Sequence, residues 1–390
     1  MKLVEVNDKS TEREFLLLPV RLYKHEKNWI RPMDKDIRAV FDPRKNKNYK
    51  QGEAIRWILK DESGLTIGRI AAFYIKKVAE AEEQPTGAVG FFECINDQEA
   101  AFKLFDAAKT WLTERGMEAM DGPVNFGDRN NWWGLLVEGF HEPNYQMPYN
   151  FPYYQKLFEA YGFKEYFQQY TYKRPMGSQV DFTPRFYEKA QTTLDNPDYT
   201  FRHITKKEFD IAHEYFLEVY NKAWAGHSGV KPMTVQQARQ TFKTLKPIAD
   251  VMLIWFAFYK NEPVAFFISI PELNQLYKHL NGQWNLWSKL KFLYLLKTGA
   301  CKKGLGIVFG VVPDHQKKGV EGGLVVSFVK KMAWKDGFHY DDIEMNWIGD
   351  FNPKMMRVVE QIGSEVYKTH ITYRKLFDET KEFKRAPIIN

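Results

Sequence analysis

The two halves of the chain match each other, and this internal repeat limits the fold more than any other feature of the sequence. Gly116 is followed by Asn125 nine residues later, and Gly337 is followed by Asn346 at the same spacing. Further pairs stay in register along each half: Asn150 with Asn352, Gly162 with Gly363, and Tyr172-Lys173 with Tyr373-Arg374. Several matches in one register, with the same hydrophobic periodicity, predict two copies of one α/β unit.

Both halves show the same order of predicted strands and helices. In the first half, periodicity and turn residues predict strands at 2–6, 54–60, 66–75 and 88–95, and before residues 125 and 174, with helices at 12–23, 98–115 and 152–161. In the second half they predict strands at 199–204, 251–259, 263–270, 306–312, 342–347 and through 375, with helices at 206–224, 234–245, 324–334 and 353–362. We therefore predict an α/β (α+β) protein with domains at 1–175 and 199–390, joined by a linker at 176–198 that is rich in polar residues, Pro and Gly.

Composition and charge narrow the class of protein. A length of 390 residues is enough for two hydrophobic cores. The net charge of +7 favours anionic partners, but the basic residues are dispersed, so we predict no nucleic-acid partner. Two cysteines, Cys94 and Cys301, exclude a disulfide framework and a cysteine-rich zinc site; we expect both in the core and no metal. The most apolar stretch, 251–259, is too short to span a bilayer and the N-terminus is not a signal peptide, so we expect a cytoplasmic protein.

The second half contains a turn suited to a pyrophosphate group. A buried strand at 306–312 leads through Gln316, Lys317, Lys318, Gly319, Val320, Gly322 and Gly323 into a helix. Glycine-rich turns between a strand and a helix present several backbone N–H groups, and the helix dipole adds positive potential there. A solvated turn that merely starts a helix is the alternative. The first half has no glycine between Cys94 and Glu99, so we predict one phosphate site in the chain.

This arrangement resembles the Gcn5-related N-acetyltransferase (GNAT) superfamily. Its Gln/Arg-x-x-Gly-x-Gly/Ala signature matches at Gln316 and Gly319, with Glu321 in the sixth position, and the superfamily's helix-starting Asn matches Asn352. A narrower likeness is to a bacterial N-acyltransferase group that includes bacterial ceramide synthases, through Gly122-Pro123-Val124-Asn125 and the segments 134–140 and 147–154. The resemblance implies two tandem GNAT-like domains, each a mixed, mostly antiparallel sheet flanked by helices, with the first domain degenerate. It also implies an acyl-CoA, either acetyl-CoA or a long-chain acyl-CoA, as co-substrate bound by the turn and Asn352.

Candidate residues for the chemistry follow from the resemblance and from the strand pattern. A backbone N–H of Val311 or Val312 would stabilise the thioester oxygen as it becomes an oxyanion. Glu344 and His315 are candidate bases for the amine, with a surface carboxylate and an exposed turn histidine as the alternatives. Many superfamily members have a tyrosine acid two turns into the last helix, where this chain has Val359.

Two further segments point to the acceptor. The run of rings and prolines before residue 154 is typical of an ordered loop, which either lines a pocket or packs between the domains. We predict an acceptor pocket that contains Asn125, Tyr149, Asn150, Tyr153 and Asn346. The basic and aromatic segment 284–303 is interpreted as a peripheral contact with the inner membrane face, or as a buried helix whose lysines reach the solvent.

The predicted function is transfer of an acyl group from a coenzyme A thioester to an amine by direct attack. The acceptor would be a small molecule, a sphingoid base or another lipid amine. A non-catalytic acyl-CoA- or ligand-binding protein with the same fold is the alternative, and a peptidyl transferase that uses aminoacyl-tRNA is disfavoured because no long basic helical hairpin is present.

Overall fold

A computed structural model describes residues 1–127, 131–176, 182–224, 232–333 and 338–389 of the chain. Within these residues, thirteen strands join into one sheet in the order β1-β2-β3-β4-β5-β13-β7-β12-β11-β10-β9-β8, with β6 paired to β13. Most neighbouring strands are antiparallel; β4 with β5 and β11 with β12 are parallel. The predicted fold class, a mixed and mostly antiparallel sheet flanked by helices, is confirmed.

The first half supplies the elements up to β7. Its strands are β1 Lys2–Glu5, β2 Gly52–Lys60, β3 Thr66–Ile75, β4 Thr86–Cys94, β5 Ala119–Gly122, β6 Leu135–Glu138 and β7 Lys164–Pro175. Its helices are α1 Lys9–Leu22, α2 Asp34–Val40, α3 Lys76–Ala79, α4 Gln98–Thr113 and α5 Tyr153–Ala160, with a 3-10 turn at Lys47–Lys50. The helix α4 buries one apolar face on the sheet, because Leu104, Ala108 and Leu112 recur every four residues.

The second half supplies the remaining elements. Its strands are β8 Tyr199–His203, β9 Ile254–Tyr259, β10 Glu262–Pro271, β11 Lys303–Val311, β12 Asp342–Gly349 and β13 Glu365–Leu376. Its helices are α6 Pro184–Leu194, α7 Ala212–Trp224, α8 Val235–Leu245, α9 Asn274–Tyr277, α10 Leu286–Lys297, α11 Val320–Ala333 and α12 Pro353–Gln361, with 3-10 turns at Val251–Leu253 and Pro313–His315. Each half packs its own core, one around Phe105 and Phe158 and the other around Phe256 and Phe266.

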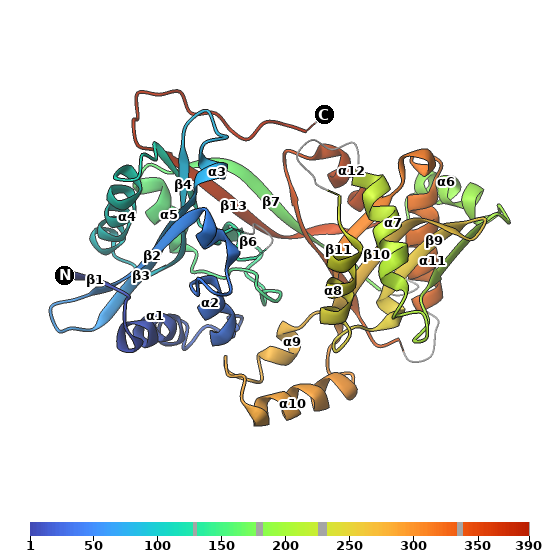
Figure 1. Cartoon of the computed structure of the whole chain (residues 1–390), viewed down its shortest axis with the longest axis horizontal. Helices are drawn as coiled ribbons and strands as arrows, with labels where there is room; N and C mark the ends of the chain where they lie inside the picture. The colour runs from blue at the N-terminus through green and yellow to red at the C-terminus, as the bar shows by residue number, and fades with distance from the viewer. Residues whose placement is uncertain (128–130, 177–181, 225–231, 334–337, 390) are drawn as a thin grey trace.

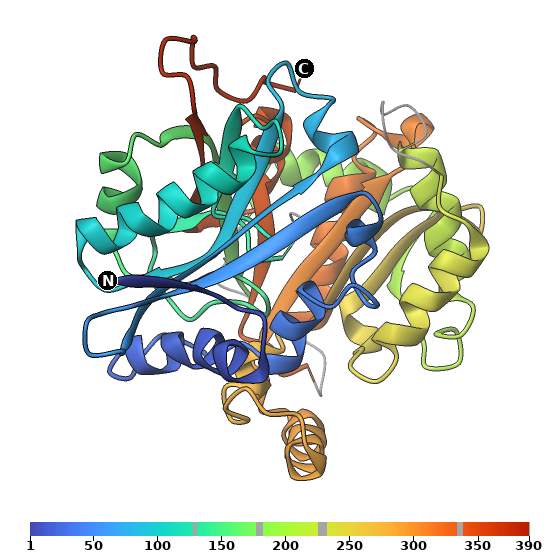
Figure 2. The ribbon, with the colours of Figure 1, turned by 60° about the vertical axis from the view of Figure 1, so that its left-hand side comes forward.

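The last strand of each half lies in the sheet of the other half. The strand β7 pairs with β12, from Asp342 opposite Pro175 onward, and β13 pairs with β5, from Leu376 opposite Ala119 onward. The two long strands also pair with each other through the centre of the molecule, as Figure 1 shows and Figure 2 shows from another side. The sheets of the two halves are therefore continuous through exchanged strands.

Several boundaries differ from the sequence prediction. The helix α11 begins at Val320 instead of residue 324, so Gly322 and Gly323 lie inside it. The predicted helix at 206–224 begins only at Ala212, because Glu208 is held in a turn by Arg202 and Thr205. The segment predicted as a linker contains the helix α6. The domain boundaries themselves stay a prediction.

Candidate active site

The predicted phosphate turn connects β11 to α11. After the 3-10 turn, Lys317 and Gly319 adopt positive φ angles of 62° and 95°, which carry the chain sharply into the helix. The Gln316 side chain fixes the entrance, because its Nε2 donates to the Val311 carbonyl at 3.1 Å. The first N–H groups of a helix have no acceptor within the helix, so those at the start of α11 are available to an anion.

Gly319 and Gly323 also let α6 and β8 pack closely on the start of α11. A Cβ at Gly319 would lie 2.3 Å from the Lys189 carbonyl oxygen, and one at Gly323 would lie 2.6 Å from the Phe201 ring. Thr193 donates its hydroxyl to the Gly319 carbonyl at 3.1 Å. The glycines therefore have a packing role here in addition to the phosphate role that the sequence suggested.

Glu321, the residue that departs from the superfamily signature, forms an ion pair with α6. Its Oε1 lies 3.3 Å from Lys189 Nζ, and its side chain is 22% exposed. The pairing directs the carboxylate toward α6 and neutralises its charge locally. A glutamate in this position is thus compatible with an anion at the start of α11.

The first half uses the equivalent helix start differently. Asp97 is the N-cap of α4, and its Oδ1 accepts the backbone N–H of Ala100 at 3.0 Å. A carboxylate from the chain itself thereby occupies the place where a phosphate oxygen would bind. The prediction of a single phosphate site, in the second half, stays a prediction.

An apolar wedge opens where β11 and β12 separate. The two strands pair in parallel from Lys303 opposite Asp342 to Gly306 opposite Met345, and then diverge. The pocket between them has about 780 Å³ of space outside the protein atoms, counting the part open to solvent. All lining residues except Arg174 and Asn346 are apolar or glycine: Met176, Phe267, Gly306, Ile307, Val308, Phe309, Val325, Phe328, Val329, Ile343, Met345, Ile348, Met355, Val358, Val359 and Ile362.

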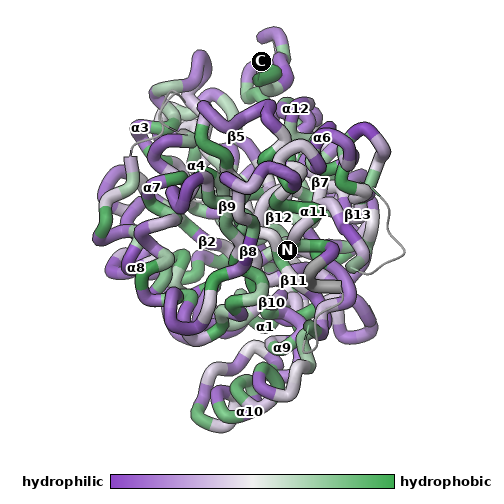
Figure 3. Tube along the Cα trace, turned by 90° about the vertical axis from the view of Figure 1, so that its right-hand side faces the viewer, coloured by the Kyte–Doolittle hydropathy of each residue, from purple (hydrophilic) through white to green (hydrophobic). Residues whose placement is uncertain are grey.

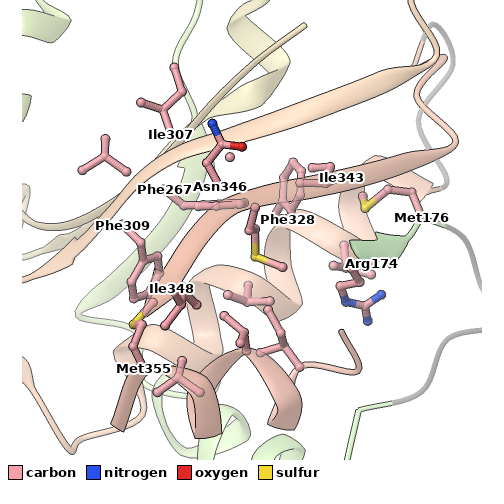
Figure 4. Close-up of a pocket in the computed structure, with 18 residues that line it drawn as sticks. Arg174, Met176, Phe267, Ile307, Phe309, Phe328, Ile343, Asn346, Ile348 and Met355 are labelled. Atoms are coloured by element: carbon pink, nitrogen blue, oxygen red, sulfur yellow. The ribbon is translucent and has the colours of Figure 1, made fainter. Parts of the chain in front are cut away.

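The two faces of the wedge differ in chemistry. Figure 4 shows Phe328 and Met355 on the side of the helices α11 and α12, and Ile307 and Asn346 on the other side of the strands. The Oδ1 atom of Asn346 is buried without a hydrogen-bond partner in the described part of the chain. An N–H or O–H group of a bound substrate could donate a hydrogen bond to this oxygen on the second face.

Backbone direction separates the two predicted oxyanion residues. Val312 donates its N–H to the Val264 carbonyl at 3.0 Å, so this group is engaged inside the sheet. Residues alternate along an antiparallel strand, so the N–H groups of Val311 and Phe309 point away from β10, toward the side where β12 diverges. Of the two predicted oxyanion residues, only Val311 directs its N–H toward β12. The N–H of Phe309 points in the same direction.

The equivalent wedge of the first half is filled by aromatic rings. The repeat register of the sequence, which matches Gly116 with Gly337 and Gly162 with Gly363, aligns seven wedge residues with first-half residues: Val325 with Leu104, Phe328 with Ala107, Val329 with Ala108, Met355 with Tyr154, Val358 with Leu157, Val359 with Phe158, and Ile362 with Tyr161. In the first half, ring centroids lie 4.7 Å apart for Phe92 and Phe105, and 4.9 Å apart for Phe105 and Phe158. Backbone pairing also continues, because Val124 donates to the Val89 carbonyl at 2.9 Å.

Glu344 lies in a buried ion cluster beneath the second face of the wedge. Its side chain is fully buried; one oxygen contacts Lys303 Nζ and the other accepts from Lys368 Nζ at 2.6 Å and from Asn144 Nδ2 at 2.7 Å. Burial alone would raise the pKa of Glu344, but Lys368 and Lys303 outweigh it and hold the pKa below its usual range. These contacts favour a fixed anion that positions two lysines; its role as a base stays a prediction.

His315 lies at the other end of β11. Its Nδ1 is 2.7 Å from the Tyr199 hydroxyl, and its ring also packs on Tyr259 at the outer edge of the sheet. Glu344 pairs with Leu305, so the length of strand between the two predicted bases is roughly 25 Å. The two side chains cannot act on one substrate atom.

The predicted acceptor residues do not share one pocket. Asn346 lines the wedge, whereas Tyr149 and Asn150 line a second pocket between α1, the segment 29–37 and the loop 132–150. Asn125 lines a third pocket. Tyr153 donates to the Cys94 carbonyl at 2.7 Å, and Asn150 holds both backbone groups of Leu136. The role of each of these residues in binding an acceptor stays a prediction.

Other predicted residues have clear local roles. Asn352 caps α12 by accepting the Met355 N–H at 3.2 Å, and Lys317 and Lys318 flank the phosphate turn. Cys94 and Cys301 are buried as expected, and burial raises the pKa of each thiol to about 12. Thiols held neutral in this way are poor nucleophiles.

The structure adds residues that the sequence did not single out. His141 stacks on Tyr367 with ring centroids 4.1 Å apart, and the Nζ atoms of Lys173 and Lys368 each lie 4.7 Å from the centre of the Tyr367 ring. These residues come from a loop and two distant strands, so no local motif could have revealed them. Within the described ranges, no three His, Cys, Asp or Glu side chains are grouped to hold a metal. None of the described helices is long and apolar enough to cross a membrane.

Comparison with known proteins agrees with the fold. Over 97% of its length the chain superposes on a tandem GNAT protein from the clavulanic acid biosynthesis pathway, with a TM-score of 0.52 and 12% identity, covering 99% of that protein. The chain is a tandem GNAT-fold protein. The glucosamine N-acetyltransferase region of a fungal GH3 β-N-acetylglucosaminidase superposes equally well, with a TM-score of 0.52 and 10% identity over 96% of this chain and 38% of that one.

Two relatives match in sequence over nearly the whole chain. The bacterial ceramide synthase of Caulobacter vibrioides is 26% identical over 96% of this chain and 97% of its own length. The YghO protein of Escherichia coli is 27% identical over 94% of this chain and 93% of its own length. No protein-family model matches the chain. The suspected resemblance to the group that includes bacterial ceramide synthases is thus confirmed.

Proposed function

We propose that the chain is an N-acyltransferase that takes its acyl group from a coenzyme A thioester bound in the wedge between β11 and β12. The observation that carries the proposal is the open apolar wedge beside the N-terminus of α11, in the half whose helix start has no carboxylate cap. The name of the ceramide synthase relative and the tandem GNAT fold support an acyl-transfer reaction.

In this proposal, three parts of the second half hold the acyl-CoA. The N–H groups at the start of α11, with Lys317 and Lys318 nearby, bind the pyrophosphate. The outward-facing backbone groups of Phe309 and Val311 line the path of the thioester, and one N–H stabilises the oxyanion. Gly319 carries the turn into α11 at a backbone angle that other residues rarely adopt.

We propose a long acyl chain over an acetyl group. On the side of α12 the wedge is lined by Met355, Val358 and Ile362, which extend over roughly 10 Å of helix, longer than an acetyl group. Burying each methylene group of an acyl chain contributes about 0.8 kcal/mol, so an apolar pocket of this extent favours long chains. The small residue Val359, in the place of the superfamily's tyrosine acid, contributes to this space.

The acceptor in this proposal is an amine, and a sphingoid or other lipid amine is the specific class. The neutral amine attacks the thioester carbon, the carbon–sulfur bond breaks, and coenzyme A leaves as a thiol. Its entry from the face of Asn346 would keep it opposite the helices that hold the acyl chain. No covalent enzyme intermediate is required, in keeping with the buried cysteines.

For the proton that the ammonium group loses, we propose His141 as the acceptor. Glu344 lies two residues before Asn346 on β12, and His141 stacks on Tyr367, whose ring contacts Lys368 of the Glu344 cluster. Burial, followed by the nearby charge of Lys368, lowers the pKa of His141, so the ring is neutral at pH 7. In a His141→Gln variant the acid limb of the kcat/KM profile should disappear; an unchanged profile would exclude this residue.

Calorimetric titration with acetyl-CoA and palmitoyl-CoA tests the binding step. We expect palmitoyl-CoA to bind at least tenfold more tightly, and binding of neither ligand would overturn the proposal. Release of free thiol with a panel of amines that includes sphinganine tests turnover. Binding without thiol release across that panel would instead support the non-catalytic ligand-binding alternative.

A further inference from the structure

The segment between β10 and β11 forms an arm that projects from the body of the molecule. The two strands pair directly where the arm begins and ends, with Pro271 opposite Gly304. Between them α9 and α10 extend away from the sheet, at the bottom of Figures 1 and 2 and again in Figure 3. The arm is therefore an addition to the sheet and not a connection that the fold needs.

The inner side of the arm is packed. Phe292 is 5% exposed and stacks on Tyr277 with ring centroids 5.2 Å apart. The Trp284 ring packs edge-on against Phe292. Lys35 of α2 places its Nζ 4.0 Å from the centre of the Trp284 ring, and Asp34 donates its N–H to the Gly282 carbonyl. These contacts fix the orientation of α10 relative to the first half.

The outer side of α10 is apolar and uncovered. Five large side chains share this face, with exposed fractions of 67% for Leu286, 78% for Trp287, 51% for Leu290, 45% for Leu293 and 68% for Tyr294. Their spacing of three, four and seven residues places them in one stripe along the helix. A contiguous stripe of this kind marks an interaction site, because folded proteins rarely leave one in water.

The charged residues around the apolar stripe of α10 indicate what kind of partner would bind it. Residues 284–303 contain no Asp or Glu, and Lys289, Lys297 and Lys302 lie exposed at the sides and end of the helix. Lysines beside an apolar face, with a tryptophan and a tyrosine within it, match the interface of an anionic bilayer. We propose that the outer face of α10 docks on the surface of a membrane that contains anionic lipids. This proposal goes beyond the acyl-transfer function and does not depend on it.

A second copy of the chain is the competing occupant of the same face. Pairing two α10 helices would bring exposed lysines of like charge together, and no acidic residue of the segment 284–303 could offset them. The observations therefore favour the lipid surface over self-association.

Co-sedimentation of the full chain with vesicles tests the docking. We expect binding to vesicles of phosphatidylglycerol and phosphatidylcholine, weaker binding at high salt, and little binding to phosphatidylcholine alone. A Trp287→Ala, Leu290→Gln variant should bind at least tenfold more weakly. A matched control, Val235→Gln with Ile388→Gln, changes two exposed apolar residues elsewhere and should bind like the unaltered chain.

Three results would overturn the proposal. They are no binding of the unaltered chain to anionic vesicles, equal binding by the Trp287→Ala, Leu290→Gln variant, and a dimer in sedimentation equilibrium that this variant abolishes. Palmitoyl-CoA titration of the same variant separates this test from the proposed function. We expect its Kd for palmitoyl-CoA to be unchanged, because these residues do not line the wedge.

Discussion

The two halves share one order of elements, yet only one of them has room for a ligand between its parallel strands. In the second half, β11 and β12 part after Gly306 and leave a wedge lined by Val329, Met355 and Val359. In the first half, Tyr154 and Phe158 fill the corresponding space. The difference teaches that side-chain volume, and not the order of the elements, distinguishes an open pocket from a packed core in this fold.

The N-termini of the two equivalent helices, α4 and α11, also differ in whether an anion could bind there. Asp97 caps the start of α4 with its own carboxylate, whereas Gly319, the residue before α11, has no side-chain oxygen to do so. The volume of the side chains at the wedge and the charge at the start of the following helix therefore both differ between the two halves. Both differences are accessible to substitution, which makes the comparison testable.

The largest expected effect concerns the buried carboxylates, one in each half. A Glu344→Gln variant leaves Lys368 buried with no opposite charge, and we expect a loss of about 3–5 kcal/mol in the free energy of unfolding. Glu93 accepts from Tyr23 and Tyr154 at 2.6 and 2.9 Å and makes one longer contact, 3.4 Å, with the buried Arg69. Because its ion pair is longer and single, Glu93→Gln should cost less, about 1–2 kcal/mol. Urea unfolding of both variants measures the difference, and equal losses would contradict it.

The same pair should show opposite pH dependence. The pKa of Glu344 is lowered in the fold, so its stabilising effect is present above the ordinary pKa of ~4.3 and is lost as the pH falls through the folded value. The pKa of Glu93 is raised by burial, so its contribution is present at low pH and is lost as the pH rises through the folded value. Urea midpoints of both Gln variants, measured from pH 3 to 8, check the two slopes.

Removing a ring from the filled wedge of the first half should lower the stability of the protein and should not create a binding site. A Phe158→Val variant removes a fully buried ring that contacts Phe92, Phe105 and Phe163, and we expect a loss of about 2–4 kcal/mol. Calorimetry should detect no second equivalent of palmitoyl-CoA, because Asp97 still caps α4. A second binding event would show that wedge volume alone is sufficient.

Filling the wedge of the second half with aromatic rings should greatly weaken the binding of palmitoyl-CoA. The loss of stability should be smaller than for the Phe158→Val variant. A Met355→Tyr, Val359→Phe variant gives the wedge the residues of the first half, and we expect the Kd for palmitoyl-CoA to rise at least 100-fold. Overpacking should cost about 1–3 kcal/mol of stability, which circular dichroism and urea unfolding can measure. A Val359→Ile control adds one methylene and should retain binding; unaltered affinity in the double variant would remove the wedge from the site.

The smallest effect is expected at the two lysines of the turn. A Lys317→Gln, Lys318→Gln variant should weaken acyl-CoA binding by about three- to tenfold, since exposed charges are screened by salt. Most of the affinity should remain, because backbone N–H groups hold the pyrophosphate. A loss above 100-fold would show that the side chains, and not the helix start, bind the phosphates.

The sequence alone predicted the structural features that depend on short-range or periodic residue patterns. The repeat, the hairpin at 61–64, the strand–turn–helix around Gly319 and the burial of both cysteines all depend on residues close together in the chain, and the structure contains each of them. The helix α10 also follows a segment whose unusual composition is visible in the sequence.

The parts that escaped prediction depend on contacts between distant segments. The helix α6 lies in a polar stretch, and its packing on Gly319 and Gly323 is not encoded in any local pattern. The ion cluster of Glu344 joins Lys303 and Lys368 from separate strands, so an alternating strand pattern suggested an accessible carboxylate instead. Strand exchange cannot be read from the repeat, because the exchanged and unexchanged pairings bury the same residues.

The exchanged strands have a consequence for the order in which the protein is made. Because β13 covers the edge of β5, the first half presents an open strand edge until residue 376 has been synthesised. Ribosome-bound chains that end before β13 would carry that exposed edge, and the first half would complete its sheet only after β13 has been synthesised. The two copies are consecutive as sequence, but their folding must end in a single common step.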